Sequence, residues 1–119
     1  MRVIPPALHR VLDFVTVIAF AGAPSVLGLS GVPALVSYAL AAVHLGMTLL
    51  TRFSSTGNQP LALKLHGTVE MLVGPILLVL PFALGWEGIA RTFYLAAGAV
   101  IVAVWALSAY AGDHAHAPG

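Results

Sequence analysis

The chain has 119 residues, of which 60% are hydrophobic and only 8% are charged. A soluble domain carries about a quarter charged residues, so this composition excludes a water-facing globular surface and indicates an integral membrane protein. The formal net charge of +1 argues against nucleic acid as a partner, and the absence of cysteine excludes disulfides, thiolate metal sites and cysteine nucleophiles.

Four apolar segments are each long enough to cross a bilayer, which takes roughly 20 residues. We expect helices over about Leu8–Leu27, Pro33–Arg52, Leu61–Leu84 and Ile89–Tyr110. A polar linker over 53–60 separates the first two helices from the last two, and a polar tail follows at 111–119. The predicted fold is all-α: a four-transmembrane-helix bundle built from two tandem helical hairpins, forming a single membrane domain over 1–119.

The two hairpins repeat one pattern with a constant offset of 57 residues. His9 and Asp13 in the first helix correspond to His66 and Glu70 in the third. The same offset relates Pro24 to Pro81, Leu27 to Leu84, Gly28 to Gly85 and Gly31 to Gly88. Chance does not readily keep histidine, acid, proline and glycine in one register. We therefore interpret the chain as a tandem duplication, with repeat 1 over about 8–52 and repeat 2 over about 61–110.

The positive charges predict the orientation of the chain in the membrane. Arg2, Arg10, Arg52 and Lys64 lie on the side of the termini, whereas Arg91 alone lies near the opposite turns. By the positive-inside rule, both termini and the linker are cytoplasmic. Trp86 and Tyr110 are expected to be interfacial anchors of the aromatic belts.

Each repeat has an acid in its first turns, a proline near the outer end of its first helix and a glycine four residues later. This layout resembles the SPW repeat, a small prokaryotic membrane repeat named for a Ser-Pro-Trp signature. The signature positions read Ala23-Pro24-Ser25 and Leu80-Pro81-Phe82, so the proline is the shared residue. The resemblance implies a multi-pass protein of the bacterial inner (plasma) membrane and transfers no functional residue.

Ionisable side chains inside a membrane are costly and usually face the bundle interior. His9 and Asp13 share one helix face because they are four residues apart, and His66 and Glu70 do the same. His44 lies in the second helix, and counting back from the end of that helix places it at a depth in the membrane similar to that of Asp13 and Glu70. We therefore predict a cytoplasmic-side cluster made of these five residues. Two threonines extend its polar faces as supporting groups, namely Thr16 and Thr48.

Three interpretations of this cluster stay open. The first is structural: each pair is a local hydrogen bond, with the carboxylate near a positive helix N-terminus and His44 bridging two helices. The second is a metal or haem site, since imidazole with carboxylate suits Zn, Fe, Mn or Cu, and a symmetric pair of His9 and His66 could ligate a haem. The third is a proton or ion relay.

The favoured function is binding of a ligand, metal or proton by this cluster in a small membrane protein. The rival from the enzyme class is a membrane oxidoreductase subunit that uses haem, a transition metal or quinone; a purely structural or interaction protein is the third class. No Ser-His-Asp arrangement, phosphate loop or dinucleotide fingerprint occurs in the sequence, so no catalytic residue is assigned.

The expected partner is the lipid bilayer, and whether the chain forms a homo-oligomer stays open. His114 and His116 are assigned to a mobile tail rather than to the site.

Overall fold

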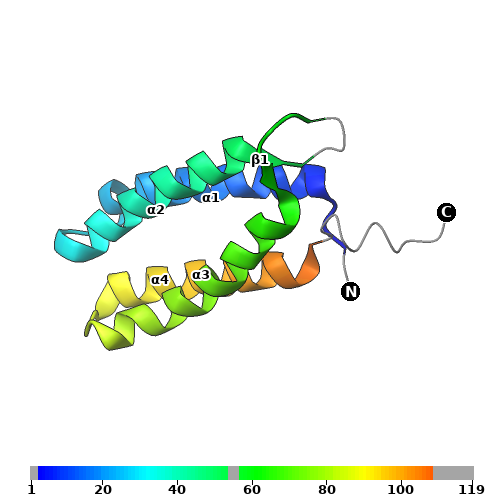
Figure 1. The fold of residues 1–119 in the computed structure, drawn as a ribbon. Helices are drawn as coiled ribbons and strands as arrows, with labels where there is room; N and C mark the ends of the chain where they lie inside the picture. The colour runs from blue at the N-terminus through cyan, green and yellow to red at the C-terminus, as the bar shows by residue number, and fades with distance from the viewer. Residues whose placement is uncertain (1–2, 54–56, 109–119) are drawn as a thin grey trace.

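The structure is a computed structural model, and it describes residues 3–53 and 57–108. Four helices make up most of this part of the chain: α1 (Pro6–Leu27), α2 (Gly31–Leu50), α3 (Leu63–Ala83) and α4 (Gly88–Leu107). Two short strands, β1 (Thr51–Arg52) and β2 (Leu61–Ala62), flank the linker between α2 and α3. Figure 1 shows α1 and α2 side by side as one hairpin and α3 and α4 as the other. The predicted all-α fold of two tandem hairpins is confirmed.

The helix bounds lie close to the expected ones, with differences at the ends. The second helix was expected to reach Arg52 but ends at Leu50, because Thr51–Arg52 form β1. The chain is already extended at Leu61–Ala62, where a helix was expected, because these residues pair with Thr51–Arg52 as a parallel strand. The helix α4 ends at Leu107. The expected helix end at Tyr110, the tail at 111–119 with His114 and His116, and Arg2 all lie outside the described residues.

Both tight turns depend on glycine in the left-handed region, which other residues rarely adopt. In the first turn, φ is 69° at Gly28 and 59° at Gly31. In the second turn, φ is 69° at Gly85 and 60° at Gly88. Positions 57 residues apart therefore have the same backbone conformation, as the repeated sequence pattern predicts.

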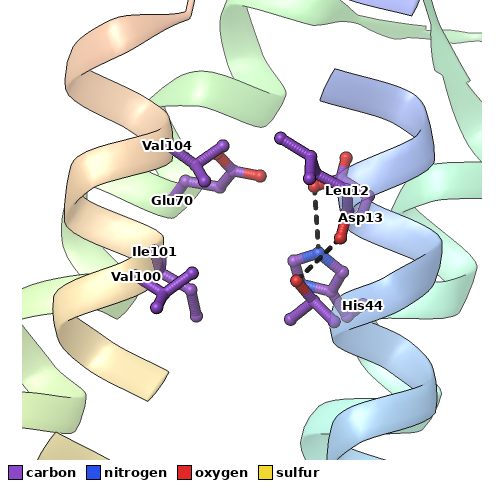
Figure 2. Close-up of a pocket in the computed structure, with 8 residues that line it drawn as sticks. Leu12, Asp13, His44, Glu70, Val100, Ile101 and Val104 are labelled. Atoms are coloured by element: carbon purple, nitrogen blue, oxygen red, sulfur yellow. Dashed lines mark hydrogen bonds and ion pairs between the residues drawn. The ribbon is translucent and has the colours of Figure 1, made fainter. Parts of the chain in front are cut away.

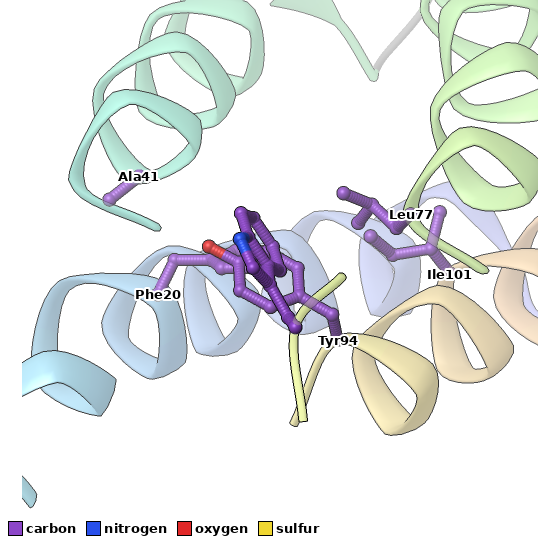
Figure 3. Packing of buried hydrophobic residues seen from close by; sticks show 6 residues of the cluster. Phe20, Ala41, Leu77, Tyr94 and Ile101 are labelled. Carbon is purple, nitrogen blue, oxygen red and sulfur yellow. The ribbon is translucent and has the colours of Figure 1, made fainter. Parts of the chain in front are cut away.

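A hydrophobic core joins the two hairpins in the half of the bundle near the turns. Figure 3 shows side chains from all four helices converging there: Phe20, Ala41, Leu77, Tyr94 and Ile101. Tyr94 is fully buried, and its hydroxyl donates to Pro33 O at 2.6 Å, which links α4 to α2. Trp86 also belongs to this core, with its ring 4.8 Å from that of Tyr94. Packing against Tyr94 thus buries the Trp86 ring. The expectation that Trp86 is an interfacial anchor stays a prediction.

All four helices are long and apolar enough to cross a membrane. Large apolar side chains project outward from them, among them Ile18, Val26 and Leu35, which are 71%, 82% and 67% exposed. Contiguous apolar surface of this kind is rare on soluble monomers. The helices are those of a multi-pass membrane protein, with the outward-facing apolar side chains suited to contact lipid.

The end of the bundle opposite the turns is tied by short backbone pairings. Thr51 pairs with Leu61 in the β1–β2 ladder, and Ile4 forms a parallel bridge with Ser108. The offset of 57 residues relates these pairings to each other, because it takes Ile4 to Leu61 and Thr51 to Ser108. In each pairing, a residue that precedes the first helix of one hairpin is thus paired with a residue that follows the second helix of the other hairpin. Ile4 precedes α1 and pairs with Ser108, which follows α4; Leu61 precedes α3 and pairs with Thr51, which follows α2.

Glycines let α3 and α4 pack at short range, as small residues do between membrane helices. A Cβ atom added at Gly74 would lie 2.7 Å from Val102 Cγ2, and one added at Gly98 would lie 3.0 Å from Gly74 O. Val102 is β-branched, so its side chain is stiff at χ1 and cannot easily turn away. The spacing of α3 and α4 therefore depends on both glycines.

We expect Gly74→Ala to lower the free energy of unfolding in detergent micelles by about 1–3 kcal/mol, because the two helices must separate. Gly46→Ala is the matched control, since nothing lies within 4 Å of a Cβ added there. Helix propensity alone should make that control slightly more stable, by up to about 1 kcal/mol. Equal unfolding temperatures for the two variants would contradict the proposed close contact.

Candidate functional site

The candidate site lies where α1 of the first hairpin meets α3 of the second. His9 and Asp13 project from α1, and His66 and Glu70 project from α3. All four side chains are buried, with both histidines 0% exposed and both acids 3% exposed. We refer to these four residues as the His–acid cluster.

Each imidazole of the His–acid cluster contacts both carboxylates. His9 Nε2 lies 3.0 Å from Glu70 Oε1 and 3.3 Å from Asp13 Oδ1. His66 Nε2 lies 2.8 Å from Glu70 Oε1 and 3.0 Å from Asp13 Oδ2. The contacts within one helix follow from the spacing of four residues. The contacts of His9 with Glu70 and of His66 with Asp13 join the two hairpins, so the four residues form one unit.

A hydroxyl group holds the far side of each imidazole. His66 Nδ1 lies 2.7 Å from Thr51 Oγ1, and His9 Nδ1 lies 2.7 Å from Ser108 Oγ. Each hydroxyl donates its hydrogen to the carbonyl four residues earlier, Met47 O for Thr51 and Val104 O for Ser108. A hydroxyl has only one hydrogen to donate. The hydroxyl oxygens must therefore accept from the rings, so both histidines carry a proton on Nδ1.

This protonation has a consequence for the Nε2 atoms. With Nδ1 protonated, Nε2 is a bare lone pair unless it also carries a proton. A lone pair facing carboxylate oxygens at 2.8–3.3 Å is repulsive. Each Nε2 therefore needs a proton, which makes the ring an imidazolium, or a metal cation shared with the carboxylates. At a buried site an uncompensated charge is very costly, and either two protons or one divalent cation leaves the His–acid cluster neutral.

Asp13 Oδ2 is short of a donor. Among the described residues, it is the buried side-chain atom without a hydrogen bond. His66 Nε2 is only 3.0 Å away, but this contact is a short ion-pair distance and not a hydrogen bond, because the ring nitrogen is directed at Glu70. A buried acceptor left without a donor costs about 1–3 kcal/mol. A cation centred among the four side chains would satisfy this oxygen.

The other predicted residues lie around the His–acid cluster. His44 Nε2 lies 3.3 Å from Asp13 Oδ1, so His44 contacts the cluster through one carboxylate. Thr16 and Thr48 donate their hydroxyl hydrogens to Leu12 O and His44 O of their own helices, and no hydrogen bond joins either of them to the cluster within the described part of the chain. The structure thus brings all five predicted ionisable residues together and leaves the two threonines peripheral.

Three contacting residues were not predicted from the sequence. Thr51 and Ser108 orient the two imidazoles, and the Phe53 ring lies against both of them, with centroid distances of 6.0 Å to His9 and 5.5 Å to His66. The sequence did contain a signal for Thr51 and Ser108, because the offset of 57 residues relates these two hydroxyl residues to each other as it relates His9 to His66. Phe53 had no such signal, since its contacts depend on the path of the linker.

A small cavity adjoins the cluster between the hairpins. Its volume is about 10 Å³, which is space for roughly one water-sized group. Figure 2 shows Leu12, Asp13 and His44 on one side and Glu70, Val100, Ile101 and Val104 facing them. Two of the four cluster residues, Asp13 and Glu70, therefore line this cavity.

No protein-family model, curated protein or solved structure matches the chain.

We expect Thr51→Val to lower the free energy of unfolding by about 1–3 kcal/mol, because it leaves the His66 Nδ1–H buried without an acceptor. Thr68→Val is the matched control: Thr68 also donates to the carbonyl four residues earlier, but it is exposed and contacts no histidine. Thermal unfolding in micelles should separate the two variants. If both are neutral, the hydroxyls do not hold the rings.

Proposed function

We propose that this chain is a multi-pass membrane protein that binds one divalent transition-metal ion, of the zinc type, in the His–acid cluster. The observation that carries the proposal is the convergence of one ligand atom from each of the four residues, all within 4.8 Å of one another. The ion would join the two hairpins, because each hairpin supplies one imidazole and one carboxylate.

The donor set and its spacing suit zinc. Zinc takes imidazole nitrogen and carboxylate oxygen at about 2.0–2.2 Å in tetrahedral geometry, which places neighbouring ligand atoms roughly 3.3–3.5 Å apart. The four nitrogen–oxygen distances in the cluster are 2.8–3.3 Å, so small shifts of the side chains would admit the ion. Metal-bound histidines commonly donate their other ring N–H to a fixed acceptor, which is the arrangement at Thr51 and Ser108.

A proton-holding site is the second candidate function. Two protons on the Nε2 atoms balance the two carboxylates as well as a divalent cation does. The observation that favours this alternative is the small cavity beside Asp13, His44 and Glu70, since it can hold a group that exchanges protons with them. Proton flux into liposomes, measured for a protein that retains no metal, would support this second function.

The geometry gives less support to a haem site. The His9 and His66 rings meet edge to face with centroids 5.5 Å apart, and both Nε2 atoms are directed at carboxylates. The cavity that adjoins them, at about 10 Å³, is far smaller than a porphyrin. An oxidoreductase that holds haem between these histidines would require the hairpins to separate.

We place the protein in the bacterial inner membrane, with both termini, the linker and the His–acid cluster on the cytoplasmic side. The distribution of Arg10, Arg52 and Lys64 against Arg91 supports this orientation. We also propose descent from a duplicated hairpin related to the SPW repeat. The matched glycine φ angles and the matched hydroxyl contacts of Thr51 and Ser108 support the duplication.

Titration of the purified protein with cobalt(II), followed by visible absorption, tests the metal proposal. We expect one ion per chain, with the intense bands of a tetrahedral site. Glu70→Gln preserves the shape of a ligand and removes its charge, so it should weaken binding by more than about 100-fold. Ser108→Ala removes only an orienting hydroxyl and should weaken binding by about 10–100-fold.

The double variant His114→Ala/His116→Ala is the control for binding by the tail, and it should still bind one ion. If this double variant loses the ion while Glu70→Gln keeps it, the metal belongs to the tail and the proposal is wrong. Binding should also weaken as the pH falls, because protons compete with the metal for the histidine nitrogens.

A further inference from the structure

An apolar groove runs along the outside of the bundle between α1 and α4. Its volume is about 210 Å³. Ala19 and Phe20 line it from α1, and Phe93 and Ala97 line it from α4. Because these helices are of membrane-spanning length, the groove lies at the depth of the lipid acyl chains.

Small side chains on one side of the molecule create the space. Ala19 and Ala97 line the groove, whereas the positions related to them by the offset of 57 residues carry Ile76 and Leu40. The wall of the groove therefore differs from the corresponding residues of the other half at these two positions.

The groove lies beside the cavity that adjoins the His–acid cluster. Thr16, Val100 and Ile101 line both the groove and the 10 Å³ cavity, so the two spaces share a wall. The ionisable lining of the cavity comes from Asp13, His44 and Glu70. A molecule in the groove would therefore have a mostly apolar wall along its length and a small polar end at the cavity.

We propose that the groove and cavity together bind a single-chain hydroxyl compound from the membrane, a long-chain alcohol or an alkylphenol. The chain lies in the groove, and the hydroxyl lies in the cavity against Asp13, His44 and Glu70. This inference stands apart from the metal proposal, because the carboxylates accept a hydrogen bond whether or not an ion is bound.

Three features select a hydroxyl head group over other lipid-soluble heads. The cavity has space for about one oxygen atom, which excludes phosphate and sugar head groups. Two carboxylates line it and offer acceptor oxygens, so a hydroxyl can donate a hydrogen bond there, whereas a carbonyl or carboxylate head, which only accepts, gains nothing from them. A hydroxyl can donate to Asp13 or Glu70 and can also place its oxygen toward a cation in the cluster.

Photolabelling of the full chain in phosphatidylcholine nanodiscs tests the proposal. The probe is dodecan-1-ol with a diazirine in the middle of its chain, and the labelled residues are mapped by mass spectrometry. We expect labels on the groove residues of α1 and α4. Excess dodecan-1-ol should compete with the probe, whereas dodecane and dodecanoate should compete at least roughly tenfold less well.

Two variants fill the groove with side chains that the other half of the molecule already carries. Ala97→Leu and Ala19→Ile should each reduce labelling roughly tenfold or more. Ala99→Leu is the control on α4, because Ala99 is exposed and does not line the groove. Thermal unfolding of each variant shows whether it is folded.

The outcomes separate this proposal from the metal site. Equal competition by dodecane and dodecan-1-ol would mean that the groove takes any acyl chain, and the hydroxyl assignment would be overturned. Unchanged labelling in folded Ala97→Leu and Ala19→Ile would overturn the groove itself. Failure of the cobalt titration leaves these expectations as they are, since labelling does not depend on the metal.

Discussion

The contact on which the structure depends is the sharing of each imidazole Nε2 between two carboxylates from different hairpins. Each hairpin packs closely along its own length, but few backbone positions of the two hairpins approach each other. In lipid, burial of apolar surface gives no strong force for bringing helices together. Polar contacts from His9 to Glu70 and from His66 to Asp13 therefore have a large share in holding the hairpins in register at this end, while the Tyr94 core does so near the turns.

Local pattern predicted the parts of the site but not its assembly. A spacing of four residues places His9 with Asp13 and His66 with Glu70, because that spacing is a property of a single helix. The crossed contacts depend on how two hairpins dock, which no local spacing encodes. For the same reason the contact of Thr51 with His66 Nδ1 could not be predicted, because it depends on the position of α3. The burial of Trp86 likewise depends on Tyr94 of the following helix.

The positions at which the two halves differ are as informative as the positions that correspond at the offset of 57 residues. The offset of 57 residues places His44 opposite Ile101, so one carboxylate has a third imidazole beside it and the other has an apolar neighbour. Ala19 and Ala97, which correspond to Ile76 and Leu40 in the other half, lie on the same side of the bundle as His44, where the groove lies beside the cavity. The corresponding residues of the two halves form the cluster that joins the hairpins and that we propose to hold a cation. The residues that differ line the groove and cavity that we propose to bind a hydroxyl compound on one side of the bundle.

The zinc K-edge X-ray absorption spectrum of the zinc-loaded protein in micelles tests the metal site most directly. We expect two imidazole nitrogens and two carboxylate oxygens at about 2.0–2.2 Å from the ion. We also expect one nitrogen contribution to disappear in His66→Ala. A spectrum of zinc surrounded by water oxygens, or an imidazole signal unchanged by His66→Ala, would contradict a metal ion held between the two hairpins.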